Sequence, residues 1–345
     1  MHDDVTRGAT GPIEADGGAW LREATIGRQE FRMAEAMRVG LTAVVLSVRQ
    51  EQPVAMVTDA KLRSGSAAGR LPGGRFYPVG QTSLEAALRE HVLETSGREL
   101  GYLEQLLTDF GPAEPGSLDA IDGARQLSVS YLALTRADNL PLEAGTRWLE
   151  CYELLPWEDF RGGRPAVLAQ TILPGLEAWA RDVSASQDSA DCETPMSRVE
   201  QVAVSFGLSG RTWDDQRVVD RFDLLHEAGL LPAASTAALS PAGLRLVAAG
   251  LGRLRAKIRY RPVVFELLAP EFTLFELQRT VEAVLGPTLH KQNFRRLVEG
   301  TGLVEPTGDV RNNTGGRPAK TFRFRREVLL ERPAPGVHVR PGRAA

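Results

Sequence analysis

Alternating apolar and polar residues predict β-strands in the first half of the chain. The runs LTAVVLSVR (residues 41–49) and PVAMVTDA (residues 53–60) are rich in β-branched residues and are separated by a polar turn, which is typical of a strand pair. RQLSVSYLALTR (residues 125–136) alternates in the same way and predicts a further strand. Strands placed before and after a glycine-containing loop and a helix favour an α/β sandwich over a doubly wound sheet.

The helix between these strands is predicted from SLEAALREHVLETSG (residues 83–97). Leu88 and Val92 lie one turn apart, as on the buried face of an amphipathic helix. Ser83 is a suitable N-cap, and Gly97 is a suitable residue to end the helix.

Helical spacing dominates the second half of the chain. DDQRVVDRFDLLHEAG (residues 214–229) predicts a helix, and SPAGLRLVAAGLGRLRAKI (residues 240–258) predicts a long amphipathic helix that begins at Ser240. A polar stretch that starts at Val183 has no periodicity, so we expect a linker there.

Two further helices are predicted close together near the C-terminus. FTLFELQRTVEAVLG (residues 272–286) begins with a capping box formed by Thr273 and Glu276. LHKQNFRRLVEG (residues 289–300) places its apolar residues on one face and Asn, Lys and Arg on the other. A short-turn helix pair of this kind is typical of a helix-turn-helix, whose second helix enters the major groove of DNA.

A β-hairpin is predicted directly after this helix pair. Phe322 and Phe324 alternate with Arg323 and Arg325, and the preceding tip, residues 315–320, contains Arg and Lys. A basic wing suits contact with DNA phosphates or entry into a narrow minor groove. The alternative is that these cations only make the domain soluble.

Composition adds a division of charge between the two ends. The net charge of −3 is distributed as roughly +9 from Arg253 onward and roughly −12 before it, which favours a nucleic-acid-binding module attached to an acidic domain. Cys151 and Cys192 have no disulfide or metal-site spacing. The chain has no long apolar run and no secretory signal pattern, so we expect a cytoplasmic protein that does not contact membranes.

The helix at residues 83–97 also carries candidate chemistry. Glu90 and Glu94 are four residues apart and therefore share a helix face, where carboxylates can hold Mg²⁺. With Arg89 they resemble the box of the Nudix hydrolases, G-x5-E-x7-R-E-U-x-E-E-x-G-U, in which U is a bulky aliphatic residue. Gln81 and Leu93 stand where that box has Glu. The other interpretation of these carboxylates is a solvated helix face.

The resemblance to Nudix domains implies a pocket that binds a nucleotide diphosphate without cutting it. It implies no required cofactor, no assigned catalytic residue or metal ligand, weak Mg²⁺ binding at most, and ADP-ribose as the effector. The strand at residues 125–136 resembles the one that carries Arg and Tyr near the ligand in ADP-ribose-type Nudix domains. The implied effector-binding residues are Gly73, Gly74, Arg75, Arg89, Glu90, Glu94, Arg125 and Tyr131.

The C-terminal region resembles a second, related family. RAKIRYRPVVFELLAPEFTLFELQRTVEAVLG, LHKQNFRRLVEGTGLVE and GGRPAKTFRF are similar to the winged helix of the Nudix-related transcriptional regulators, the NrtR family. This resemblance implies a homodimeric repressor of NAD-metabolism genes that responds to ADP-ribose. The expected DNA-binding residues are Thr273, His290, Lys291, Asn293, Arg295, Arg296, Arg317 and Lys320.

The expected fold class is α+β, with a Nudix-like α/β/α sandwich, a helical insertion and a winged helix-turn-helix. The expected ranges are a mobile leader (residues 1–38), the nucleotide-sensing domain (39–182), the insertion and linker helix (183–252), the DNA-binding domain (253–330) and a disordered tail (331–345). Two other functions stay open. One is an active ADP-ribose pyrophosphatase with an accessory C-terminal domain, and the other is an RNA-binding protein that uses the same basic surface.

Overall fold

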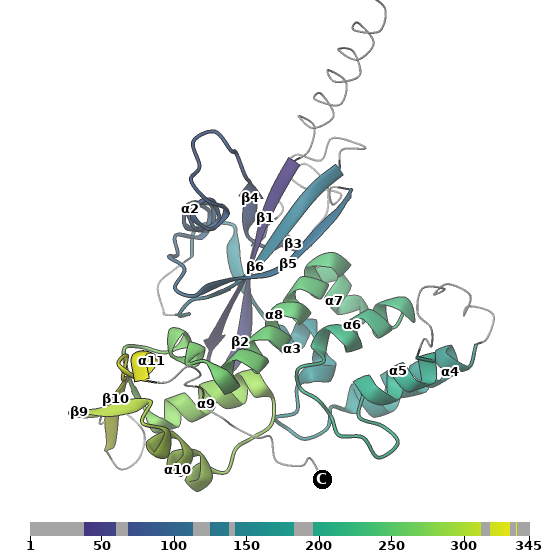
Figure 1. Cartoon of the computed structure of the whole chain (residues 1–345). Helices are drawn as coiled ribbons and strands as arrows, with labels where there is room; N and C mark the ends of the chain where they lie inside the picture. Colours follow the sequence, from purple (N-terminus) through teal and green to yellow (C-terminus); the bar gives the residue numbers. More distant parts are fainter. Residues whose placement is uncertain are drawn as a thin grey trace, which may run out of the picture.

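A computed structural model describes residues 38–59, 68–112, 125–137, 142–182, 196–311, 318–331 and 336. The mobile leader and the disordered tail expected at the two ends lie almost entirely outside these residues. Figure 1 shows a sheet domain, a group of helices beside it, and a smaller domain with its own three-stranded sheet.

The larger sheet is built around a hairpin of two buried strands. Strands β1 (Arg38–Arg49) and β2 (Gln52–Asp59) pair antiparallel, as the alternation predicts, and the turn between them places Gln50 and Glu51 at positive φ. The path through the sheet is β3-β2-β1-β6-β5, with β4 paired to β1 and β7 paired to β2. The remaining strands are β3 (Gly69–Arg70), β4 (Gly73–Arg75), β5 (Leu103–Pro112), β6 (Arg125–Leu134) and β7 (Thr146–Glu150).

Both faces of this sheet are covered by helices. Alternate side chains of β1 point to opposite sides of the sheet, and both sets are apolar, so each face needs a helix to bury it. Ala43 and Val45 pack with helix α2 (Leu84–Ser96), whereas Val44 and Leu46 belong to the core that contains helix α8 (Pro241–Tyr260). The result is the expected α/β/α sandwich.

The expected insertion is helical where the structure describes it. Helices α6 (Val218–Glu227) and α8 correspond to the two helices predicted from the sequence. The other helices of this middle region are α3 (Cys151–Leu154), η1 (Pro156–Glu158), η2 (Leu168–Ile172), α4 (Leu173–Arg181), α5 (Arg198–Ser205) and α7 (Ala233–Ala238). Within the described residues, none of the helices has the length and hydropathy needed to span a membrane.

The C-terminal domain has the helix-turn-helix and wing expected from the sequence. Helix α9 (Leu274–Leu285) and helix α10 (Lys291–Thr301) are followed by a hairpin, and the three strands are ordered β8-β10-β9. The other elements are η4 (Val263–Leu267), β8 (Glu271–Thr273), β9 (Val304–Arg311), β10 (Ala319–Phe324) and α11 (Val328–Glu331).

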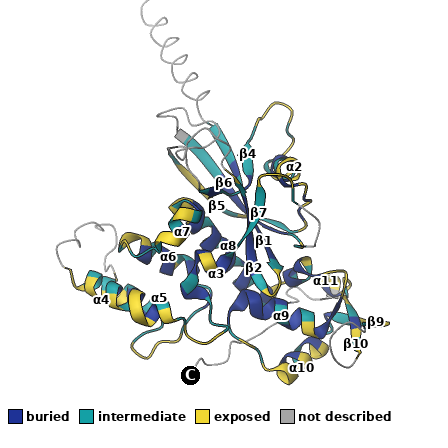
Figure 2. Ribbon diagram, turned by 180° about the vertical axis from the view of Figure 1, so that it is seen from behind, coloured by how far each residue is buried: buried dark blue, intermediate teal, exposed yellow. Residues whose placement is uncertain are grey.

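One hydrophobic core joins the two domains. It contains Val44 and Leu132 of the large sheet, Leu251 of α8, and Leu277 and Val298 of the helix pair. Figure 2 shows buried residues running from β1 and β2 through α8 to α9. Helix α8 is continuous through residue 253, so the sequence-based boundary at that residue falls inside a helix that packs on the large sheet.

Candidate functional site

Helix α10 presents one apolar face to the domain core and one polar face to solvent. Phe294 and Val298 are buried, and Leu297 is half-buried. Gln292 is exposed as well, a position that helical spacing alone did not mark as a DNA contact. The exposed residues expected to contact DNA are His290, Lys291, Asn293, Arg295 and Arg296. The N-terminal half of α10 therefore carries amides and cations of the kind that read base edges and bind phosphates.

The turn between α9 and α10 is fixed by two buried side chains of α9. Glu282 accepts a hydrogen bond from the backbone N–H of Leu289 at 2.8 Å, and Gln278 donates one to the carbonyl of the same residue at 2.9 Å. Gln278 also donates to Glu282 at 2.8 Å. Both backbone groups of Leu289 are therefore held from α9, so the two helices are expected to move together. Helical spacing alone did not reveal this role.

Thr273 is buried in the structure, whereas the sequence led us to expect it on the DNA-binding surface. Its side chain is only 3% exposed, and its hydroxyl accepts a hydrogen bond from Glu276 N at 3.2 Å. Glu276 returns the bond by accepting from Thr273 N at 2.7 Å. Thr273 is the N-cap of α9 in the predicted capping box, and a side chain so deeply buried cannot reach a phosphate without rearrangement.

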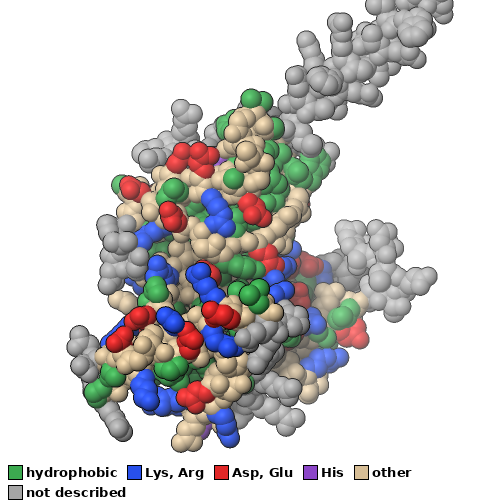
Figure 3. Space-filling view, turned by 60° about the vertical axis from the view of Figure 1, so that its left-hand side comes forward, with side chains coloured by type: hydrophobic (Ala, Val, Ile, Leu, Met, Phe, Trp, Pro, Cys, Tyr) green, Lys and Arg blue, Asp and Glu red, His purple; other side chains and the backbone are tan. Residues whose placement is uncertain are grey.

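The wing is a hairpin of β9 and β10. Lys320 is exposed near its tip, and Arg317 lies outside the described residues. Arg311 at the end of β9 bonds to Glu276 of α9 at 2.5 Å, which ties the wing to the helix pair. In Figure 3 several Lys and Arg side chains lie at the lower end of the molecule, which is formed by this domain. The exposed cations of α10 and β10 thus belong to the same domain.

The Nudix-like box occupies helix α2, as expected, but its side chains are engaged differently from those of a metal site. Arg89 donates to the carbonyls of Leu100 and Gly101, so it anchors α2 to the segment that follows. Gln81 accepts from Tyr77 N at 2.8 Å. Leu93 is 45% exposed at a place where the box has Glu.

Two exposed carboxylates of the box are left, Glu90 and Glu94. In the described part of the chain, no three His, Cys, Asp or Glu side chains are grouped so that they could hold a metal ion. A donor set of two exposed carboxylates beside a leucine does not fit tight Mg²⁺ binding, because Mg²⁺ requires nearly ideal octahedral oxygen coordination.

The two glycines before the helix are required by close packing. They lie in strand β4, which pairs with β1, so they form part of the sheet and not a free loop. A Cβ atom on Gly73 would lie 2.1 Å from the Leu41 carbonyl oxygen, and one on Gly74 would lie 2.7 Å from the ring of His91. Next to them, the guanidinium of Arg75 lies 5.4 Å from the centre of the Tyr77 ring.

Tyr131 and Arg125 both come from β6. Tyr131 is only 3% exposed and packs in the core between the sheet and α2, where burial and then the charge of Glu85 raise its pKa. Tyr131 is therefore mainly a core residue whose hydroxyl lies near the box helix. The side chain of Arg125 lies outside the described residues.

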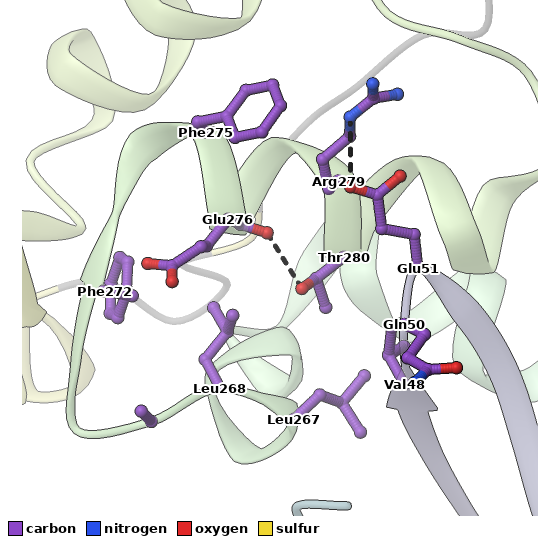
Figure 4. A pocket seen from close by; sticks show the side chains of 11 residues that line it. Val48, Gln50, Glu51, Leu267, Leu268, Phe272, Phe275, Glu276, Arg279 and Thr280 are labelled. Carbon is purple, nitrogen blue, oxygen red and sulfur yellow. Dashed lines mark hydrogen bonds and ion pairs between the residues drawn. The ribbon is translucent and has the colours of Figure 1, made fainter. Parts of the chain in front are cut away.

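A surface pocket of about 400 Å³ lies where the two domains meet (Figure 4). It is lined by Gln50 and Glu51 from the β1–β2 turn and by Phe272, Phe275 and Arg279 from the C-terminal domain, among others. Arg279 Nε lies 3.6 Å from a carboxylate oxygen of Glu51, so an ion pair crosses the domain boundary here.

Comparisons with known proteins identify the C-terminal domain. Residues 264–324 match the family model described as the NrtR DNA-binding winged helix domain. A protein of Acinetobacter baylyi named "ADPR responsive transcriptional repressor NtrR" is 42% identical over 79 residues, which are 23% of this chain and 31% of that protein. The chain thus matches about a third of the length of this relative.

The fold of the whole chain is similar to two solved structures. Shewanella oneidensis NrtR complexed with a 27mer DNA is 18% identical, with a TM-score of 0.53 over 85% of this chain and 95% of that one. A second structure of Shewanella oneidensis NrtR is 19% identical, with a TM-score of 0.50 over 84% of this chain and 94% of that one. The chain thus combines a Nudix-like α/β/α sandwich with a C-terminal domain that matches the NrtR winged helix model. The sequence match to the NrtR family lies in residues 264–324, and the fold of the chain is similar to that of Shewanella oneidensis NrtR.

Proposed function

We propose that this protein is a DNA-binding transcriptional regulator whose winged helix binds double-stranded DNA. The observation that carries the proposal is the exposed polar face of α10, with Lys291, Asn293, Arg295 and Arg296, on a helix whose turn is fixed from α9. The winged-helix family match supports the same function. Cations bind the phosphates without regard to sequence, whereas an amide such as Asn293 can distinguish an adenine edge.

The proposal extends to a nucleotide effector in the Nudix-like domain, with ADP-ribose as the first candidate. The relative in Acinetobacter baylyi is named as responsive to ADPR. Arg75 and Tyr77 offer a cation for a phosphate and an aromatic ring for a base, beside the box helix. In its finer form the proposal is a homodimeric cytoplasmic repressor of NAD-metabolism genes.

DNA binding is tested by selecting duplexes from a random-sequence pool with the full chain and measuring the affinity for the selected duplex as salt is varied. The logarithm of the binding constant should fall by about 0.9 per phosphate contact for each unit in the logarithm of salt concentration. Lys291→Ala should reduce that slope by about 0.9. Arg181→Ala is the matched control, because Arg181 is an exposed cation of α4 in another part of the molecule (Figure 1). A salt-independent affinity, or equal slopes for the two variants, would refute the assignment of this surface.

The alternative function is an active ADP-ribose pyrophosphatase, which Glu90 and Glu94 favour as remaining box carboxylates. Incubation with ADP-ribose and Mg²⁺ or Mn²⁺, followed by detection of AMP, separates the two functions. Turnover on the order of 1–10³ s⁻¹ would be ordinary enzyme behaviour and would reject a purely sensing domain. An RNA-binding function predicts instead that single-stranded or duplex RNA competes with the selected DNA at equal concentration.

A further inference from the structure

The C-terminal end of helix α9 is capped by residues from outside the winged helix. The last carbonyls of a helix have no partner within the helix. Here Tyr152 of α3 donates its hydroxyl proton to the carbonyl of Ala283 at 2.7 Å. Arg255 of α8 donates from Nε to the carbonyl of Val284 at 2.9 Å. The positive charge of Arg255 also lies at the negative end of the α9 dipole, where a cation is stabilising.

Both capping side chains are held firmly on their own side. Arg255 is 1% exposed, and its Nη1 bonds to Glu158 at 2.5 Å and to the carbonyl of Asp215 at 3.1 Å. Arg255 Nη2 reaches the Tyr152 hydroxyl at 3.4 Å, so the two caps contact each other. Glu158 lies in η1, at the end of the segment that follows the large sheet.

The helical insertion completes this cluster. Arg221 of α6 forms two bonds with Glu158, at 2.6 Å and 3.0 Å, and donates to the carbonyls of Ser205 and Asp214. One buried carboxylate therefore joins a guanidinium of the insertion to a guanidinium of α8. Removing Glu158 would leave two buried guanidinium groups without a carboxylate, whereas Glu158 keeps one partner if either arginine is removed.

We propose that Tyr152 and Arg255 are positioning residues that set the direction of α10 from the Nudix-like side of the molecule. The path runs from the two caps to the end of α9, and from α9 through Gln278 and Glu282 to Leu289, the residue that precedes His290 and α10. A displacement of α3 or α8 moves both caps, and the fixed turn transmits it to the DNA-facing helix. This inference rests on the proposed function, and it names the physical link between the two domains.

The test uses the full chain with Tyr152→Phe and Arg255→Met. Tyr152→Phe removes one hydroxyl and keeps the ring, and Arg255→Met leaves Glu158 paired with Arg221. Both variants should bind ADP-ribose within twofold of the original protein. Their preference for the selected duplex over random duplex should fall about threefold to tenfold. The factor by which ADP-ribose changes DNA affinity, typically 5–150-fold for coupled sites, should move toward one.

The matched control is Arg245→Met. Arg245 lies on the same helix as Arg255, and its hydrogen bonds among the described residues go to Asp223 of α6, at 2.7 Å and 3.0 Å. Arg245→Met should retain both the preference for the selected duplex and the response of DNA affinity to ADP-ribose. If Tyr152→Phe and Arg255→Met behave like this control, the positioning role is overturned.

Hydrogen exchange separates this inference from the proposed function. If the original protein selects no duplex, the proposed DNA-binding function is wrong. The capping of α9 by Tyr152 and Arg255 can still be tested, because it affects amide exchange at the end of α9. The amides of residues 285, 286 and 288–290 should exchange at least about threefold faster in Tyr152→Phe than in Arg245→Met, with the large sheet unchanged. Equal exchange in the two variants would overturn the capping role whatever the protein binds.

Discussion

Glu158 carries one negative charge between two guanidinium groups inside the protein. Burial alone would raise the pKa of this carboxyl, but the charges and hydrogen bonds of Arg221 and Arg255 outweigh burial and hold the pKa below its ordinary value of 4.5. In the unfolded chain the carboxyl therefore takes up its proton at a higher pH than in the folded protein. The folded state gains stability above about pH 4.5 and loses it as the pH falls through the lower folded pKa.

The corresponding measurement is the free energy of unfolding in urea between pH 7 and pH 3.5. It should fall more steeply with acidity below pH 4.5 for the original protein than for Glu158→Gln, which has no proton to take up. Glu158→Gln leaves two buried guanidinium groups against one neutral amide, so this single variant can fail to fold. In that case the double variant Glu158→Gln with Arg221→Met replaces it in the measurement. Parallel pH dependences for original and variant would contradict the prediction.

The roles of individual buried arginines could not be predicted from the sequence. In the sequence, Arg253, Arg255 and Lys257 all lie near the end of the helix predicted at residues 240–258, and helical spacing does not distinguish their roles. In the structure Arg255 is buried at the α9 cap, whereas Arg253 and Lys257 bond to Glu104 of β5. Arg255 and Glu158 are 97 residues apart, and helical spacing gives no information about partners at that distance.

Helix α9 shows how a local signal can be read correctly and its function misassigned. The T-x-x-E spacing predicts Thr273 as a capping residue, and the cap is present. Its expected contact with DNA is not supported, because the side chain is buried in the cap. A capping box depends on neighbours within one turn, so the sequence suffices to predict it. Accessibility depends on the packing of β8 and β10, which the sequence does not encode locally.

Thr273→Ala should therefore lower the free energy of unfolding by about 1 kcal/mol, because the N-cap oxygen is lost. Thr273→Ser keeps that oxygen and should lose less. At a temperature where all variants are folded, neither should change DNA affinity by more than about twofold, whereas Lys291→Ala should weaken it. Urea unfolding and DNA titration together check this. If Thr273→Ala left stability unchanged and weakened DNA binding, the result would instead support a direct contact between Thr273 and DNA.

The other elements can likewise be divided into those that local sequence predicts and those that depend on distant partners. Apolar periodicity, together with caps and turns, predicts most of the longer elements. These are β1, β2, β6, α2, α6, α8, α9, α10 and the wing. Strands β5 and β7 were not anticipated, since their positions depend on pairing with β6 and β2. Arg89, Glu90 and Glu94 lie on α2, the helix predicted for them. The hydrogen bonds that Arg89 donates to backbone carbonyls and that Gln81 accepts from Tyr77 N depend on how the surrounding segments fold.

At the scale of the whole molecule, effector and DNA must affect each other equally if the proposed function is right. ADP-ribose should weaken binding of the selected duplex by about 1–3 kcal/mol, and the duplex should weaken ADP-ribose binding by the same factor. Arg75→Ala should reduce ADP-ribose affinity without changing DNA affinity in its absence, because Arg75 lies on β4 beside the box helix. Calorimetric titrations in both orders measure the two factors. A factor of one in both orders would show that the two binding events are not coupled and would contradict the proposal.

The single core that runs from the large sheet through α8 into the helix pair has a consequence for how this protein can change over generations. A substitution on the α8 face of the sheet, at Val44 or Leu132, alters the surface against which the C-terminal half is packed. Such a change is tolerated only if residues in α8 or α9 adjust with it. We therefore expect the two halves to change together, so that an exchange of winged helices between relatives would have to carry α8 along with its matching sheet.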